Sequence, residues 1–336
     1  MESPAQEIKI DGYTPLILAV LYGTAATVQK LSEIPGICLD AANSDLYSPL
    51  WIAANKGNME MVRSLVEAGA NLEISGGKYL TKPLGEAVLF GSVEMVKYLI
   101  SKGAYIDSRS INESTPANYA ASYVNLLILK ILKASGADLD GVHGIGDVTL
   151  LILAAANNQA DIVDYLISQK VDVNKQDADG KNALGFAASN NYLNILQSLV
   201  RAGADLNVFY EPEQLSSLSN AILYDNSNAA LFLSTSGADV NSQSSEGYTA
   251  SFIAAQTNNL PILEALADAG ANLETKGGPF EMTPLAVAAL KGHLDIVQYL
   301  TAKGVNLQAT NKDGKTALAL AREYGNDDVV KFLEEK

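Results

Sequence analysis

Very few residues of this chain belong to the types that enzymes and metal sites use. The 336 residues include two histidines, His143 and His293, and a single cysteine, Cys38. A metal site needs several clustered ligands, and acid–base catalysis needs a histidine with a positioned partner. The two histidines lie far apart in the sequence, and one cysteine can form neither an intrachain disulfide nor a zinc cluster. We therefore expect no catalytic residue, no metal and no cofactor.

A glycine-rich stretch is the remaining candidate for chemistry. Gly141, Gly144 and Gly146 superficially match a phosphate-binding loop. No Lys-Ser or Lys-Thr follows them, and no strand–helix–strand pattern surrounds them, so the requirements of such a loop are not met. These glycines predict an ordinary loop.

The dominant feature is a short phrase that returns ten times, in its clearest form Thr14-Pro15-Leu16-Ile17-Leu18-Ala19. Successive copies are 33 or 34 residues apart, and the sixth residue of each copy is alanine. A fixed period of this length is the signature of a repeat architecture. The copies begin at Thr14, Ser48, Lys82, Thr115, Thr149, Asn182, Ser216, Thr249, Thr283 and Thr316.

Each phrase predicts the start of a short helix. Ser, Thr or Asn stands at nine of the ten first positions, with Lys82 as the exception, and such side chains cap helix N-termini. Each helix is expected to end at a residue suited to a left-handed turn, such as Gly23, Gly57 or Gly91, while Asp225 and Val124 fit less well. A second apolar-periodic stretch follows, as in residues 59–66, and predicts a second helix.

The repeats account for nearly the whole chain. Turn-forming residues such as Asp179-Gly180 and Asp313-Gly314 precede the phrases and predict a hairpin between successive helix pairs. No single unit can bury its apolar face alone, so stability must come from stacking. The polar residues of 327–336 suit a C-terminal cap, and we expect about ten repeats over 11–336 after an N-terminal extension, 1–10.

A period near 33, a hairpin, two helices and a T-P-L-x-x-A phrase together resemble the ankyrin repeat. Residues 291–297 and 313–318 come closest to its consensus, and the consensus accounts for His293 as a structural residue. The resemblance implies an α-class solenoid of helix-turn-helix units with β-hairpin fingers. The usual histidine of the T-P-L-H phrase is missing from all ten copies, and Trp51 takes its place in the second repeat.

The resemblance also implies where a partner would lie. Ankyrin arrays usually bind proteins along a concave face made of finger tips and the exposed side of the first helix. Aromatic residues stand eight positions after the start of the phrase in five of ten repeats, Tyr324 among them, and Phe280 lies on a finger. Large rings with a polar edge are enriched at binding hot spots. In repeats one to four the predicted contact residues are Tyr13, Tyr22, Tyr47, Trp51, Tyr79, Phe90 and Tyr123. The alternative is that such rings pack between neighbouring fingers.

Charge marks a second candidate surface. The net charge is −15, and the segment 134–275 holds 17 acids against four bases. A nucleic-acid backbone would be repelled there, whereas a basic protein segment would be attracted. The predicted contacts in repeat seven are Tyr210, Glu211, Glu213, Tyr224 and Asp225. The alternative is that the acids only keep the stack soluble.

These patterns predict a non-enzymatic module that binds a partner protein on its concave face. An adaptor, an inhibitor of a basic partner and a microbial effector all fit this class. The alternative is an enzyme or small-ligand receptor that uses a cleft between repeats, near Asn157 and Asn190. We see no membrane span and no signal peptide, and we expect a monomeric, cytoplasmic protein with no nucleic-acid partner. The alternative location is outside the cytoplasm, for a protein whose leader was removed or for a secreted effector.

Overall fold

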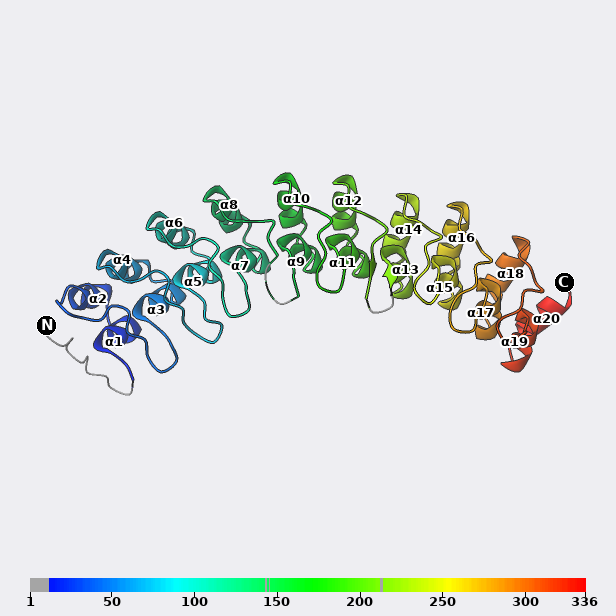
Figure 1. Cartoon of the computed structure of the whole chain (residues 1–336), viewed down its shortest axis with the longest axis horizontal. Helices are drawn as coiled ribbons and strands as arrows, with labels where there is room; N and C mark the ends of the chain where they lie inside the picture. Colours follow the sequence, from blue (N-terminus) through cyan, green and yellow to red (C-terminus); the bar gives the residue numbers. More distant parts are fainter. Residues whose placement is uncertain (1–11, 143, 145, 212–213) are drawn as a thin grey trace. The chain divides into compact units, whose positions relative to one another are not determined.

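The computed structural model of the chain describes residues 12–142, 144, 146–211 and 214–336. It contains pairs of short helices joined by irregular fingers, as predicted (Figure 1). The predicted extension 1–10 lies outside the described residues, as do His143 and Glu213.

The contacts divide the chain into two compact units, Met1–Asn157 and Asn158–Lys336, and each is described by itself. Unit 1 contains α1 (Pro15–Tyr22), α2 (Ala25–Ser32), α3 (Pro49–Asn55), α4 (Met59–Glu67), α5 (Pro83–Phe90), α6 (Val93–Ser101), α7 (Pro116–Ser122), α8 (Leu126–Ala134) and α9 (Leu150–Ala156). Unit 2 contains α10 (Ala160–Ser168), α11 (Ala183–Ser189), α12 (Leu193–Arg201), β1 (Phe209–Tyr210), β2 (Leu215–Ser216), α13 (Ser217–Leu223), α14 (Ser227–Thr235), α15 (Ala250–Gln256), α16 (Leu260–Asp268), α17 (Pro284–Lys291), α18 (Leu294–Ala302), α19 (Ala317–Glu323) and α20 (Asp327–Glu334).

The predicted helix caps are confirmed. At nine of the ten phrase starts, the Ser, Thr or Asn side chain accepts a hydrogen bond from the backbone N–H three residues later. Lys82 makes no such bond, also as expected, and its ammonium group instead lies 3.3 Å from Glu73 Oε2. In nine of the ten repeats, the first helix is therefore fixed at its start by a side chain from its own phrase.

The ten alanines of the phrases form the close-packed interior of both units. All ten are buried, nine of them completely. Within each unit, the first helices of neighbouring repeats pack on one another and the second helices form another layer, for example α3 on α5 and α2 on α4 (Figure 1). Alanine allows this close approach because a larger side chain would overpack the interface.

The turn between the two helices of a repeat is left-handed at most positions. Gly57, Gly91 and Asn191 have positive φ values, as predicted. Val124 also does, although a β-branched side chain disfavours that conformation, and so does Asp225, whose short polar side chain tolerates it. The prediction for Gly23 is wrong, because α1 keeps an α-helical hydrogen bond from Gly23 N to Ala19 O and the chain then leaves in extended backbone, with φ at −93°.

The fingers are hairpins with little regular strand. β1 and β2 pair antiparallel, and elsewhere isolated bridges such as Gly76 with Thr81 close a finger. Neighbouring fingers are joined by single backbone bonds, as from Ile111 N to Tyr79 O and from Lys312 N to Phe280 O, both 2.9 Å. The fingers of a unit therefore form a connected row.

A second set of bonds joins repeats at the loop after each second helix. A carboxylate or amide oxygen of one repeat accepts a hydrogen bond from a backbone N–H about one period later, as from Asn272 N to Asn241 Oδ1, 2.7 Å. We call this series the inter-repeat ladder. Its other described acceptors are Asp40, Glu73, Asp107, Asn174, Asn207 and Glu274.

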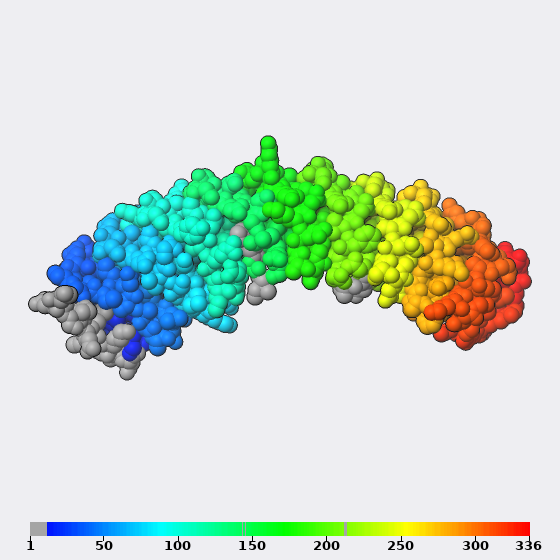
Figure 2. All heavy atoms as spheres, viewed as in Figure 1, coloured from blue at the N-terminus to red at the C-terminus, as the bar shows by residue number. Residues whose placement is uncertain are grey.

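Within each unit, consecutive repeats are spatial neighbours, as the order of colours in the space-filling view shows (Figure 2). Each repeat thus buries its apolar face against the next one, as a solenoid requires. Over the part of the chain that the structure describes, every helix is too short to cross a membrane.

Candidate functional site

Three predicted aromatic residues of unit 1 lie at the same repeat position and are exposed. Tyr22, Phe90 and Tyr123 each stand at the end of a first helix, with 83%, 54% and 66% of their surface exposed. We call these three rings the aromatic strip. In repeat two the same position is Lys56, whose ammonium group donates to the carbonyl oxygen of Leu21 at 2.6 Å.

Phe90 is held in place although it is exposed. A Cβ atom built on Gly57 would come within 2.0 Å of the tip of the Phe90 ring, so the ring lies directly on the Gly57 backbone. The glycine therefore serves both the left-handed turn and the close approach of the ring. The tip of the Phe90 ring is packed, while about half of the residue's surface stays exposed for a contact.

Tyr47 and Trp51 were also predicted as contact residues, but they pack against the next finger. Their rings are stacked, with centroids 4.7 Å apart, and both are only half-exposed. Gly76 and Gly77 lie on these rings, since a Cβ on either would come within 2.8 Å of the indole. The packing alternative is therefore the one that the structure supports for this pair.

The edge of Trp51 enters a buried polar network. Its Nε1–H donates to Thr81 Oγ1 at 3.1 Å, and the Thr81 hydroxyl donates to Glu86 Oε1. The second oxygen of Glu86 accepts from Asn55 Nδ2 at 2.7 Å. Glu86 is 4% exposed, and a buried carboxylate is tolerated here because both of its oxygens are hydrogen-bonded.

The two remaining predicted rings of unit 1 differ in exposure. Tyr79 is 51% exposed on its finger, beside the exposed Ile111 of the next finger, to which it is bonded through the backbone. Tyr13 is half-buried. Tyr79 and Ile111 therefore give the finger side of repeats three and four an apolar edge.

In repeat seven, the prediction that Tyr210 contacts a partner is wrong. The residue is 3% exposed, because β1 turns its ring inward against Gly185 and the side chain of Lys181. Burial raises the pKa of the Tyr210 phenol, and partial burial against the Tyr210 and Phe186 rings lowers the pKa of Lys181. Tyr210 is a packing residue.

The other described candidates of repeat seven are exposed but lie in two separate places. Glu211 lies on the finger, whereas Tyr224, 64% exposed, and Asp225 lie at the end of α13. Several acidic side chains of the surrounding segment accept hydrogen bonds from backbone N–H groups. Asp205 and Asp239 each accept a bond from the N–H two residues later, and Glu274 belongs to the inter-repeat ladder. Part of the acidic character of this segment is thus structural.

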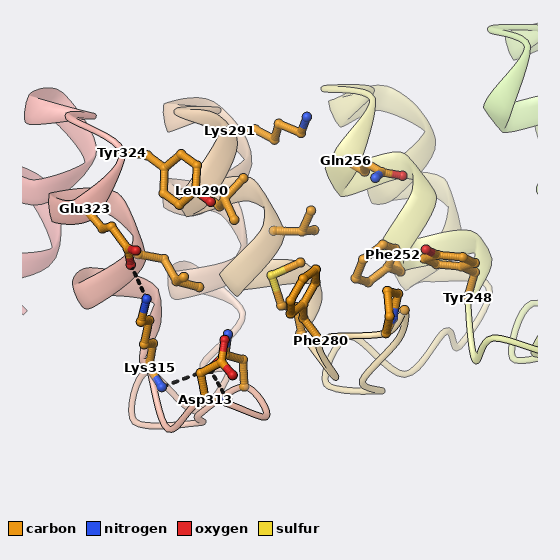
Figure 3. Close-up of a pocket in the computed structure, with 16 residues that line it drawn as sticks. Tyr248, Phe252, Gln256, Phe280, Leu290, Lys291, Asp313, Lys315, Glu323 and Tyr324 are labelled. Atoms are coloured by element: carbon orange, nitrogen blue, oxygen red, sulfur yellow. Dashed lines mark hydrogen bonds and ion pairs between the residues drawn. The ribbon is translucent and has the colours of Figure 1, made fainter.

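The structure adds a groove in unit 2 that the sequence did not predict. It has a volume of about 310 Å³ and lies between the fingers of repeats eight to ten and their first helices (Figure 3). Its floor is apolar, with the buried residues Phe252, Val287 and Leu320. The rings of Phe280 and Tyr324, 53% and 59% exposed, flank it.

Charged groups stand at the edges of this groove. Lys315 on the finger is paired with Glu323 on α19 at 2.6 Å, and Asp313 lies beside it (Figure 3). Lys291 lies on the helix side, at the end of α17, and takes part in no ion pair recorded for the described residues. The groove thus combines an apolar floor with a cation at one edge.

The alternative of a polar cleft finds little support at its predicted residues. The amides of Asn157 and Asn190 donate to carbonyl oxygens of their own helices, at 2.9 and 2.8 Å. His293 Nε2 lies 3.2 Å from the carbonyl oxygen of Gln256, to which it donates, and so joins two repeats. Among the described residues, no group of three or more His, Cys, Asp or Glu is placed to hold a metal ion.

Comparison with known proteins identifies the repeat. The family model for ankyrin repeats in three copies matches residues 16–110, 117–210, 218–311 and 252–336. The chain is 29% identical over 188 residues to the ankyrin repeat protein YahD of Escherichia coli, covering 54% of this chain and 92% of YahD.

Longer relatives match over only part of their length. The chain is 29% identical over 210 residues to the ankyrin repeat and KH domain-containing protein mask-1 of Caenorhabditis elegans, which is 61% of this chain and 8% of mask-1. It is 30% identical over 201 residues to the palmitoyltransferase AKR1 of Lachancea kluyveri, which is 57% of this chain and 26% of AKR1. The chain thus spans less than a third of the length of these longer curated relatives. With the repeat phrase, the helix pairs and a family model that covers most of its length, the chain belongs to the ankyrin repeat family.

Proposed function

We propose that this chain is a non-enzymatic module that binds a partner protein through the exposed side of its first helices and fingers. Ankyrin repeats generally mediate protein–protein interaction. The observation that carries the proposal is the aromatic strip, because stacking of the repeats does not require exposed rings at this position. Repeats five, six and eight have Asn157, Asn190 and Thr257 there.

A second contact is proposed in repeat seven. Tyr224 presents an exposed ring beside the exposed carboxylate of Asp225, and Glu211 adds an exposed carboxylate on the finger. A ring next to carboxylates suits a Lys- or Arg-bearing segment, through ion pairing and cation–π contact. The partner proposed for this surface is a protein with a basic segment.

A photo-crosslinking experiment tests the proposed surface. The photoreactive amino acid p-benzoylphenylalanine replaces Tyr123 in the full chain, and irradiation is carried out in an extract of the source cells. Tyr105 provides a matched control, since it is 62% exposed in unit 1 but lies in the loop after α6. We expect discrete adducts, identified by mass spectrometry, from position 123 and not from position 105.

The outcome can contradict either part of the proposal. Equal adduct patterns from positions 105 and 123 would show that the aromatic strip is not the contact surface. Adducts that survive Phe90→Ala and Tyr22→Ala without loss would do the same. A salt titration separates the second surface, because screening weakens the contact with Asp225 and Glu211 more than an aromatic contact.

A further inference from the structure

We infer that the groove of repeats eight to ten holds an aromatic side chain of a partner segment, with an acidic residue of that segment beside Lys291. This inference rests on the proposed function and specifies the chemistry of the ligand. It comes from comparing the groove with the same positions of repeats two to four, where the chain fills the space itself.

The same finger construction occurs in both units. In unit 1, Gly76 and Gly77 lie on the Tyr47–Trp51 pair. In unit 2, the corresponding glycines lie on the Tyr248–Phe252 pair, whose centroids are 5.2 Å apart. A bridge closes each finger, Gly76 with Thr81 and Gly277 with Met282. The two fingers therefore share the same glycine contacts with a ring pair and the same closing bridge.

The side chains around that frame differ in size. Trp51 in repeat two corresponds to the smaller Phe252 in repeat eight. Tyr119, whose ring lies 3.6 Å from a Cβ built on Gly85, corresponds to the smaller Leu320. Two large side chains of unit 1 thus have smaller counterparts in unit 2. Both counterparts, Phe252 and Leu320, line the groove of about 310 Å³.

The polarity differs as well. Thr81 accepts the Trp51 indole N–H and in turn donates to Glu86; the corresponding residues of unit 2 are Met282 and Val287. Both of these apolar residues line the groove. A buried polar occupant would find few hydrogen-bond partners on this floor, so its cost of desolvation would not be recovered. The floor therefore favours an apolar group.

The volume sets the size of that group. Pockets for whole small molecules start at about 300 Å³, so this groove suits one large side chain rather than a helix or a folded domain. The exposed rings of Phe280 and Tyr324 can pack against it from the sides, and aromatic pairs are favoured beyond the area that they bury. An indole or phenol ring, with its apolar body on the floor and its N–H or O–H toward the open side of the groove, matches the rings that Trp51 and Tyr119 supply in unit 1.

Charge complementarity fixes the flanking residue. At the position of Phe90, repeat nine has Lys291, an exposed cation on the helix side of the groove (Figure 3). The other nearby cation, Lys315, is neutralised by Glu323. Asp313 lies on the finger side, where it disfavours a second acid. A partner segment with one acidic residue next to its aromatic ring, directed toward the helices, places that carboxylate near Lys291. It also keeps the carboxylate away from Asp313 and does not compete with Glu323 for Lys315.

Short fluorescein-labelled Gly/Ser peptides test this inference on the full chain. One peptide carries Asp-Trp at its centre, and matched peptides carry Asn-Trp, Lys-Trp or Asp-Ala. We expect fluorescence anisotropy to show the tightest binding for Asp-Trp, about threefold weaker binding for Asn-Trp, as one exposed ion pair allows, and no saturable binding for Asp-Ala. Lys291→Gln should remove the preference for Asp-Trp over Asn-Trp.

The groove can be closed with residues that the chain already uses. The double variant Phe252→Trp, Leu320→Tyr introduces the side chains found at positions 51 and 119 and should weaken binding of the Asp-Trp peptide at least tenfold. A matched change outside both the groove and the aromatic strip, Tyr105→Ala, should leave it unchanged. Circular dichroism melts establish whether each variant is folded. If the double variant does not fold, the single variant Leu320→Tyr replaces it in the same binding measurement.

Equal binding of the Asp-Trp peptide to the wild type and to a folded, closed variant would overturn the inference. So would failure of that peptide to bind while position 123 still crosslinks to a protein, a result that leaves the proposed function standing. A dimer in sedimentation velocity that the closed variant abolishes would instead make a second copy of this chain the occupant, which also overturns the inference. Failure of both the peptide and the crosslinking experiments would refute the proposed function itself.

Discussion

The indole N–H of Trp51 donates to the hydroxyl of Thr81 at 3.1 Å, across the boundary between repeats two and three. The Thr81 hydroxyl in turn donates a hydrogen bond to the buried carboxylate of Glu86. Trp51, which stands at the place of the usual ankyrin histidine, thus joins a first helix to the next finger. The bond makes Trp51 part of the repeat interface.

We expect Thr81→Val to lower the free energy of unfolding of unit 1 by about 1–3 kcal/mol, because it leaves the Trp51 N–H and one Glu86 oxygen buried without a partner. Urea unfolding followed by the fluorescence of Trp51, the only tryptophan of the chain, measures this. Thr81→Ser keeps the hydroxyl and is the control. A loss as large in Thr81→Ser would show that packing, and not the hydrogen bond, is responsible.

Gly77→Ala should destabilise the chain more than Gly103→Ala. Both glycines have positive φ, 71° and 94°, so both variants incur backbone strain of about 1–2 kcal/mol. Only at Gly77 would the new Cβ also meet the Trp51 ring, at 2.8 Å, whereas nothing lies within 4 Å at Gly103. Chemical denaturation of the two variants should therefore differ by a further 1–3 kcal/mol, about the cost of overpacking. Equal losses would refute the close contact.

The stability of unit 2 should depend on pH through Lys181. Desolvation lowers its pKa in the folded protein, although Asp177 and Asp179 partly oppose this. At a pH below both the folded and the unfolded pKa, Lys181 is charged in both states, so the folded state bears the full cost of the buried charge. That cost is relieved as pH rises through the lowered folded pKa toward the ordinary Lys value, so this residue contributes a rise in stability over that window.

The variant Lys181→Met removes the charge and keeps much of the side-chain volume. Its stability advantage over the wild type should be largest at pH 7 and should shrink near pH 10.5, as measured by urea midpoints. The neighbouring Tyr210 stays neutral over most of this range because burial raises its pKa. A constant difference between the two proteins across this range would contradict the prediction.

Tyr210→Phe should change stability little, whereas Tyr210→Ala should cost about 3–5 kcal/mol, as for other buried aromatic residues. The Tyr210 hydroxyl is buried and makes no hydrogen bond of good geometry with the described residues around it, so its removal sacrifices no bond. Thermal melts of the two variants test this. A large loss in Tyr210→Phe would reveal a polar partner of the hydroxyl and would contradict the prediction.

The fold could be predicted from sequence because each repeat carries local signals that stacking does not override. The N-cap residues were identified correctly even at Lys82, where the cap is missing, because capping depends on one side chain and its own helix. Gly23 was predicted wrongly, since glycine permits several backbone conformations and its neighbours decide among them.

The site could be predicted only in part. Tyr22, Phe90 and Tyr123 are exposed because a position at the end of a short helix faces outward in every repeat. The packing of Trp51 and the burial of Tyr210 depend on which residue the adjacent repeat supplies, here Gly76, Gly77 or Gly185. The sequence of one repeat alone does not contain that information. The groove of repeats eight to ten was missed for the same reason. A comparison of equivalent positions, Trp51 with Phe252 and Tyr119 with Leu320, would have indicated the groove from the sequence.

The inter-repeat ladder has a consequence for the charge of the molecule. Its acceptor is a side-chain oxygen, which asparagine offers as well as aspartate, and both occur, as at Asn207 and Asp40. Exchanging one for the other changes the net charge by one unit and leaves the rung intact. Surface potential can therefore be tuned repeat by repeat while the stack stays the same, and replacement of Asn207 by aspartate would make the surface more acidic while keeping the acceptor for the Asp239 N–H.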